Sequence, residues 1–126
     1  MKKQDRINKL CSYSFQIDGE IVPKARPRVT RGKAYLPQRY RNWKNQAISQ
    51  LLSQRTIVDP LKKVIIKIEL YGKLRGDLDN LSGAILDALV QAQIIVDDRI
   101  SVLKELSVKH CDGKTKQARI NITEIV

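Results

Sequence analysis

The chain has 126 residues and a formal net charge of +11, with 24 lysines and arginines against 13 aspartates and glutamates. Its length suits one domain, so we expect residues 1–126 to form a single unit. A hydrophobic content of 42% and a charged content of 29% are typical of a globular protein and exclude an extensively disordered chain. No stretch approaches the roughly 20 apolar residues that span a bilayer, and the first ten residues lack a signal-peptide core, so we expect a cytoplasmic protein that does not bind membranes.

The first predicted strand alternates apolar and polar residues. Its apolar positions are Tyr13, Phe15 and Ile17, and the pattern continues toward Val22. Residues 23–36 contain two prolines and a glycine, which break regular structure. This segment is therefore predicted to be a loop or a loose hairpin.

A helix and a strand are predicted next. Residues 38–54 place apolar side chains along one helical stripe, in which Tyr40 and Trp43 are expected to belong to the core. Residues 62–72 are rich in β-branched side chains and predict a strand. The apolar face of that strand carries Ile66, Ile68 and Leu70.

Residues 79–93 predict a second helix, with Asp79 or Asn80 as its N-cap. Its apolar positions cover more than one stripe, so the helix is either buried on two sides or part of a subunit interface. A strand is predicted over 99–110, and the alternating segment 118–123 is predicted to be its antiparallel partner in a closing hairpin. The predicted fold class is α/β (α+β), with a small mixed sheet and two main helices.

Basic residues are concentrated near the N-terminus. Residues 23–44 carry eight lysines and arginines and no acidic residue, which favours contact with a polyanion such as DNA over a merely solvated basic loop. The predicted DNA-binding residues are Lys24, Arg26, Arg28, Arg31, Lys33 and, further along the chain, Arg75.

Aspartates show the opposite segregation. Five of them occur between residues 76 and 98 with no lysine or arginine among them: Asp77, Asp79, Asp87, Asp97 and Asp98. Close carboxylates repel one another, and they would also repel an anionic ligand, unless cations lie between them. If the strand beginning near Arg99 lies beside the strand ending near Gly72, the loop with Asp97 and Asp98 should reach the same end of the sheet as Asp77 and Asp79. The sequence thus predicts that these acids meet.

Carboxylate oxygens of this kind suit Mg²⁺ or Mn²⁺, which can activate water and stabilise charge on a phosphate under attack. Each acid also has a structural interpretation, as a helix cap, a solvated helix residue or a turn former. Motifs for nucleotide or zinc binding are lacking, so no small-molecule cofactor is expected. His110 is expected to be structural, and Cys11 and Cys111 lack the spacing of a metal site and are expected to be reduced.

The aspartate pattern "DLDNL…ILDAL…VDD" and the basic segment "VPKARPRVTRGKAYLP" together resemble the RusA family of Holliday junction resolvases, small homodimeric nucleases often carried by phages. The resemblance covers nearly the whole chain. It implies a Mg²⁺- or Mn²⁺-dependent endonuclease that nicks four-way DNA junctions symmetrically. It also implies that Asp77, Asp79 and Asp98 are essential metal-binding residues, with Asp97 as a further ligand and Asn80 and Asp87 in support.

One position departs from the family pattern. Many members carry a lysine where this chain has Gly83, and Lys73, Arg75 or Arg99 is a possible substitute for its charge. Paired nicking of a junction with two-fold symmetry requires two active sites, whereas each chain has one set of aspartates. A homodimer is therefore expected. The helix from residue 80 to 93 is a candidate part of its interface. Two alternatives remain: a non-catalytic or weakly catalytic junction-binding protein, and a nuclease for flaps, forks or RNA.

Overall fold

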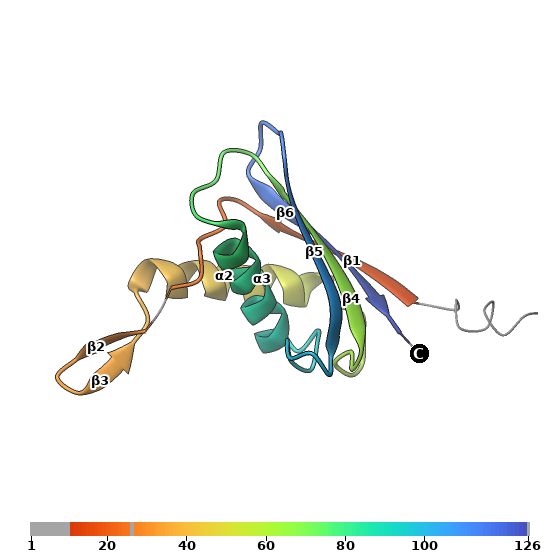
Figure 1. Ribbon diagram of the computed structural model, residues 1–126, viewed down its shortest axis with the longest axis horizontal. Helices are drawn as coiled ribbons and strands as arrows, with labels where there is room; N and C mark the ends of the chain where they lie inside the picture. Colours follow the sequence, from red (N-terminus) through yellow and green to blue (C-terminus); the bar gives the residue numbers. More distant parts are fainter. Residues whose placement is uncertain (1–10, 26, 126) are drawn as a thin grey trace, which may run out of the picture.

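The computed structural model describes residues 11–25 and 27–125, which form a four-stranded mixed sheet with two helices on one of its faces (Figure 1). The strand order is β1-β6-β4-β5, and a separate two-stranded sheet pairs β2 with β3. In chain order the elements are β1 (Cys11–Asp18), β2 (Arg28–Thr30), β3 (Lys33–Tyr35), α2 (Gln38–Gln54), β4 (Val64–Tyr71), α3 (Leu78–Gln91), β5 (Leu103–Cys111) and β6 (Gln117–Glu124). Neither helix in these residues has the length and apolar character needed to cross a membrane.

The N-terminal half follows the sequence prediction closely. Helix α2 has the predicted bounds, and the predicted loose hairpin is formed by β2 and β3. Strand β1 ends at Asp18, so its predicted continuation toward Val22 is wrong. The cause is Gly19, whose φ of +96° turns the chain out of the extended conformation while its N–H donates to the Lys116 carbonyl at 2.9 Å.

The core lies between the sheet and the two helices. Tyr40 and Trp43 of α2 are buried there as predicted, with ring centroids 6.0 Å apart. Helix α3 is buried on two sides, because α2 packs against it as well as the sheet. The buried face of β4 is the predicted one and consists of Val64, Ile66, Ile68 and Leu70.

The closing hairpin predicted from residues 99–110 and 118–123 does not form. Strand β6 pairs antiparallel with both β1 and β4, and β5 pairs with β4 in parallel. The burial of the strands explains the difference. Ala118, Ile120 and Ile122 of β6 are completely buried, which suits a central strand, whereas β5 is mostly exposed and occupies an edge. Residues 112–116 therefore connect β5 to β6 past β4.

At the other edge of the sheet, two glutamines of α2 cover the second half of β1. The Gln54 side chain accepts a hydrogen bond from the Gln16 N–H at 2.8 Å and donates one to the Gln16 carbonyl at 2.7 Å. The Gln50 side chain accepts from the Asp18 N–H at 2.8 Å and donates to the Asp18 carbonyl at 3.4 Å. This glutamine pair satisfies the backbone groups that a neighbouring strand would otherwise bind.

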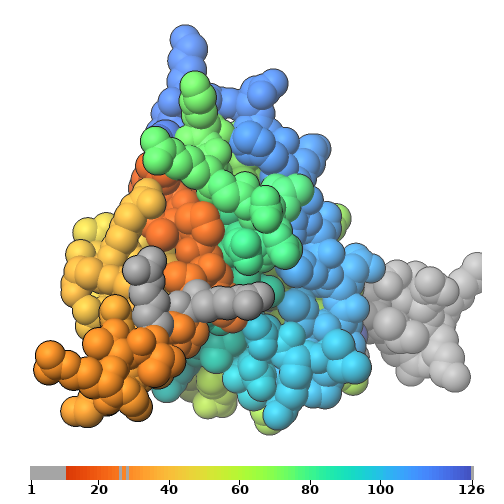
Figure 2. Space-filling model, turned by 60° about the vertical axis from the view of Figure 1, so that its left-hand side comes forward, coloured from red at the N-terminus to blue at the C-terminus, as the bar shows by residue number. Residues whose placement is uncertain are grey.

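The β2–β3 hairpin, residues 28–35, extends away from the sheet and the helices (Figure 1) and forms a separate lobe in orange in Figure 2. Its two strands contact mainly each other. It therefore contributes little to the core.

Candidate active site

Two of the predicted metal-binding aspartates lie at the N-terminus of α3. Asp77 is the N-cap residue, so the predicted capping by Asp79 or Asn80 is wrong. The Asp77 backbone carbonyl accepts the first helical hydrogen bond, from Leu81 N–H at 3.0 Å, but its carboxylate makes no capping bond. Asp79 follows in the first turn, and both residues are exposed. Among the described residues neither carboxylate forms a salt bridge, and both lie at the positive end of the helix dipole.

The start of the basic segment is attached to this helix end. The Lys24 N–H donates to the Asn80 carbonyl at 2.9 Å. Gly76, with a φ of +105°, lies so close to Pro23 that a Cβ at this position would be 2.5 Å from Pro23 Cγ. The loop before Asp77 is therefore held in place by the segment that carries the basic residues.

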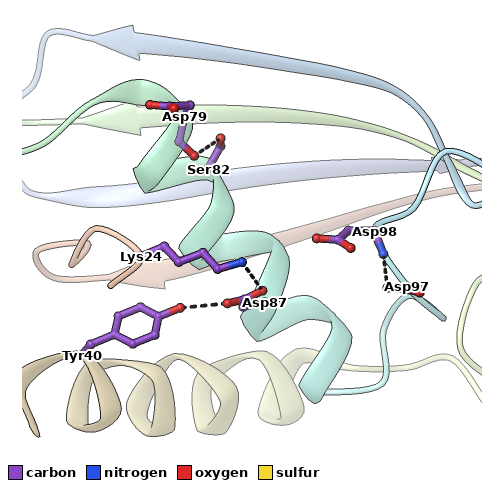
Figure 3. A network of polar contacts seen from close by, with 7 residues as sticks. All are labelled: Lys24, Tyr40, Asp79, Ser82, Asp87, Asp97 and Asp98. Carbon is purple, nitrogen blue, oxygen red and sulfur yellow. Dashed lines mark hydrogen bonds and ion pairs between the residues drawn. The ribbon is translucent and has the colours of Figure 1, made fainter. Parts of the chain in front are cut away.

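A polar network joins the same segment to the middle of α3 (Figure 3). Lys24 Nζ lies 3.3 Å from Asp87 Oδ1, and the Tyr40 hydroxyl donates to Asp87 Oδ2 at 3.0 Å. The aliphatic part of Lys24 passes over Gly83, where an added Cβ would lie 3.3 Å from Lys24 Cδ. The small residue at 83 thus leaves room for a cation that comes from elsewhere in the chain. This placement could not be predicted from the sequence, because residues 24 and 83 are distant along the chain.

Burial, and then the nearby Asp87 carboxylate, raise the pKa of the Tyr40 hydroxyl. A tyrosine whose pKa is higher in the folded than in the unfolded protein stabilises the fold below the unfolded-state pKa of about 10. This stabilisation is lost as the pH rises through the pKa of the folded state. We expect Tyr40→Phe to be less stable than wild type by about 1 kcal/mol at pH 8, through loss of the hydrogen bond to Asp87. We expect this difference in unfolding free energy between wild type and variant to become smaller above pH 10.

Urea denaturation of both proteins from pH 8 to pH 11 measures this effect. Tyr13 and Tyr71 also have raised pKa values, because burial disfavours their charged forms, but they are present in both proteins. A constant difference in unfolding free energy across this range would contradict the assignment to Tyr40.

The other two predicted metal ligands lie on the loop after α3. An isolated parallel bridge between Leu61 and Ile95 holds the start of this loop beside the start of β4. The Asp98 N–H donates to Asp97 Oδ1 at 2.8 Å, and Arg99 Nε lies 3.7 Å from Asp97 Oδ2. The Asp97 carboxylate therefore contacts its two neighbours in the chain, while Asp98 is exposed.

The predicted meeting of these acids within one chain is wrong. Strands β4 and β5 are neighbours, as predicted, but they are parallel, with Val64 opposite Leu103. Asp77 follows the end of β4, whereas Asp98 precedes the start of β5, and the eight residues of β4 hold these ends roughly 26 Å apart. Figure 3 shows Asp79 at the first turn of α3, whereas Asp97 and Asp98 are on a separate loop to the side of the second half of the helix. Among residues 11–25 and 27–125, no group of three or more aspartate, glutamate, histidine or cysteine side chains is placed to hold a metal ion.

The predicted DNA-binding residues are spread over three places. Arg31 and Lys33 are exposed on the β2–β3 hairpin, and Arg75 is exposed next to Gly76. Lys24 is paired with Asp87 as described above. Arg26 lies outside the described residues, and of Arg28 only the backbone, in β2, is described.

Comparison with known proteins places most of the chain in one family. A search of curated proteins found no match. Residues 18–123 match the family model described as endodeoxyribonuclease RusA. Because this match spans most of the 126-residue chain, the protein belongs to the RusA family of endodeoxyribonucleases.

Proposed function

We propose that this protein is a divalent-metal-dependent nuclease that resolves Holliday junctions by symmetrical nicks. The observation that carries the proposal is the match of residues 18–123 to the RusA family model. The charge distribution supports it, since a segment with basic residues is attached to the helix end that presents two exposed aspartates. DNA is the proposed partner because the chain is strongly basic and duplex DNA is a dense polyanion.

Mg²⁺ or Mn²⁺ is the proposed cofactor. The residues that would hold it are Asp77, Asp79 and Asp98, together with Asp97, and the supporting residues are Asn80 and Asp87. Their chemistry fits, because oxygen ligands suit these ions and, in the described part of the chain, none of Asp77, Asp79 and Asp98 forms a salt bridge. When bound, such an ion lowers the pKa of its water and offsets charge on the phosphate.

We propose further that a homodimer completes this site. Asp77 and Asp79 lie at the start of α3, whereas Asp98 lies on the loop that follows the helix. This separation argues against one chain holding one ion with all three aspartates. A two-fold arrangement that brings Asp77 and Asp79 of one subunit to Asp98 of the other solves this and creates two equivalent sites. Exposed apolar side chains near the Asp98 loop support a protein contact there: Ile100 is 87% exposed, Val96 42% and Leu106 of β5 39%.

A second candidate function is junction binding without efficient cleavage. The observation that favours it is the absence of a three-ligand metal cluster in residues 11–25 and 27–125 of the single chain. The two candidates differ in their response to a divalent ion, since only the nuclease requires one for its product.

A cleavage assay on labelled DNA tests the proposal. The substrates are a synthetic four-way junction, a flap, a fork and a linear duplex of matched sequence, each with Mg²⁺, with Mn²⁺ or with EDTA. We expect paired nicks at symmetrical positions of the junction only when a divalent ion is present. Tight binding with no cleavage under any condition would favour the second candidate, and equal cutting of duplex and junction would contradict resolvase function.

A further inference from the structure

The β2–β3 hairpin exposes apolar side chains that nothing in the fold explains. Val29 is 71% exposed and Tyr35 is 46% exposed, at positions where the chain projects from the body. A two-stranded hairpin is marginally stable by itself, and exposed apolar surface adds no stability without a partner. The residues therefore indicate a contact surface.

The apolar side chains lie on both faces of the hairpin. Val29 is opposite Ala34 in the register, and Tyr35 is opposite Arg28, one position further along the strands. Because successive side chains of a strand point to opposite faces, Val29 and Tyr35 are on opposite sides. An element that docks flat on a partner needs apolar residues on one face only, whereas an element that enters between two surfaces needs them on both.

The tip of the hairpin is narrow and basic. Arg31 and Gly32 form a two-residue turn with φ values of +52° and +77°, which is the tightest common hairpin connection. Residues 28–35 include three basic residues and no acidic one. A second copy of this chain, with a net charge of +11, is a poor partner for such a tip, while DNA offers phosphates beside apolar base faces.

We propose that the β2–β3 hairpin inserts into the branch point of four-way DNA, where Val29 and Tyr35 pack against bases and Arg31 and Lys33 bind the flanking phosphates. Apolar side chains wedged between base pairs must break stacking, and this costs least where stacking and pairing are already interrupted. The hairpin thereby selects branched DNA over continuous duplex. The inference rests on the proposed function, because it takes branched DNA as the ligand.

The test measures binding in EDTA, so that it does not depend on cleavage. The full-length protein is titrated into a four-way junction carrying 2-aminopurine at the branch point, and into a linear duplex of the same sequence. Wild type is expected to raise the fluorescence of the branch-point reporter and to leave a reporter within a duplex arm unchanged. The Val29→Thr/Tyr35→Thr variant keeps strand-forming residues and charge. It is expected to lose that signal and to bind the junction about tenfold more weakly, with duplex affinity nearly unchanged.

Two controls isolate the apolar contribution. Val58→Thr alters a valine outside the hairpin that is even more exposed, at 88%, and should leave both affinities unchanged. Arg31→Gln/Lys33→Gln removes phosphate contacts, so it should weaken binding to junction and duplex alike and reduce the salt dependence.

Three results would overturn the inference. The first is an unchanged fluorescence of the branch-point reporter when wild type is added. The second is an unchanged ratio of junction affinity to duplex affinity in Val29→Thr/Tyr35→Thr. The third is a smaller oligomer of that variant in the absence of DNA, because this would assign the hairpin to a protein contact. If the double variant does not fold, the wild-type reporter signal decides. A protein that opens the branch point but never cuts it would contradict the proposed nuclease function and leave the hairpin inference standing.

Discussion

Asp79→Asn and Asp98→Asn are each expected to lower Mg²⁺-dependent junction nicking by more than about 100-fold, because even residues behind a metal ligand contribute about 10- to 100-fold. Both variants should still bind the junction, since the basic hairpin is distant from either change. Single-turnover cleavage and EDTA binding assays measure the two effects. Unchanged cleavage by both variants would refute the assignment of these aspartates.

Mixing the two inactive variants tests whether the site spans two subunits. In a mixed dimer with a shared site, one site combines both substitutions and the other has neither, so about a quarter of all sites in an equal, exchanged mixture are intact. We therefore expect mixing to restore nicking of one strand, without paired cuts. The control is a mixture of Asp77→Asn with Asp79→Asn, which lie on the same helix end and should not rescue each other. No rescue in the first mixture would place each site within one chain.

Gly76→Ala is expected to produce the largest stability loss among the glycines near the site. A side chain at φ +105° costs about 1–3 kcal/mol, and the 2.5 Å approach to Pro23 Cγ adds overpacking of about 1–3 kcal/mol. The loop before Asp77 should shift, so cleavage should fall as well. Urea denaturation and the junction assay measure both effects.

Gly19→Ala is the matched control for this prediction. Gly19 has a similar φ of +96°, but a Cβ there would meet no atom within 4 Å. The difference in unfolding free energy between the two variants therefore reports the contact of Gly76 with Pro23, apart from backbone strain. Equal losses in both variants, with normal cleavage by Gly76→Ala, would show that this contact does not position Asp77.

Local features of the fold could be predicted from the sequence. The bounds of α2 and the buried face of β4 follow from apolar periodicity, which the backbone geometry imposes on every helix and strand. The partners of each strand could not be predicted in this way. The residue pair Asp112-Gly113 is typical of a hairpin turn. In the structure, however, β6 is the more buried of the two strands and lies between β1 and β4. Local turn chemistry was overridden by the burial of distant residues.

The same limitation affected the candidate site. Its residue types and the charge segregation were visible in the sequence, but the direction of β5 relative to β4 was not. Two parallel strands that follow each other in the chain need a crossover connection, and here α3 provides it. Asp77 lies where this connection begins and Asp98 where it ends. The clustering of Lys24 with Asp87 was also invisible, since no sequence pattern relates two side chains 63 positions apart.

The glutamine pair of α2 has a consequence for how this protein behaves at high concentration. Open strand edges recruit other chains and seed fibrillar deposits, and natural proteins block them. Gln50 and Gln54 block the second half of the β1 edge, at Gln16 and Asp18, against the addition of a strand from another chain. The opposite edge, β5, carries Lys104, Glu105 and Lys109, and charged side chains on an edge strand oppose such pairing. A few polar side chains outside the proposed metal site thus oppose the addition of further strands to this sheet.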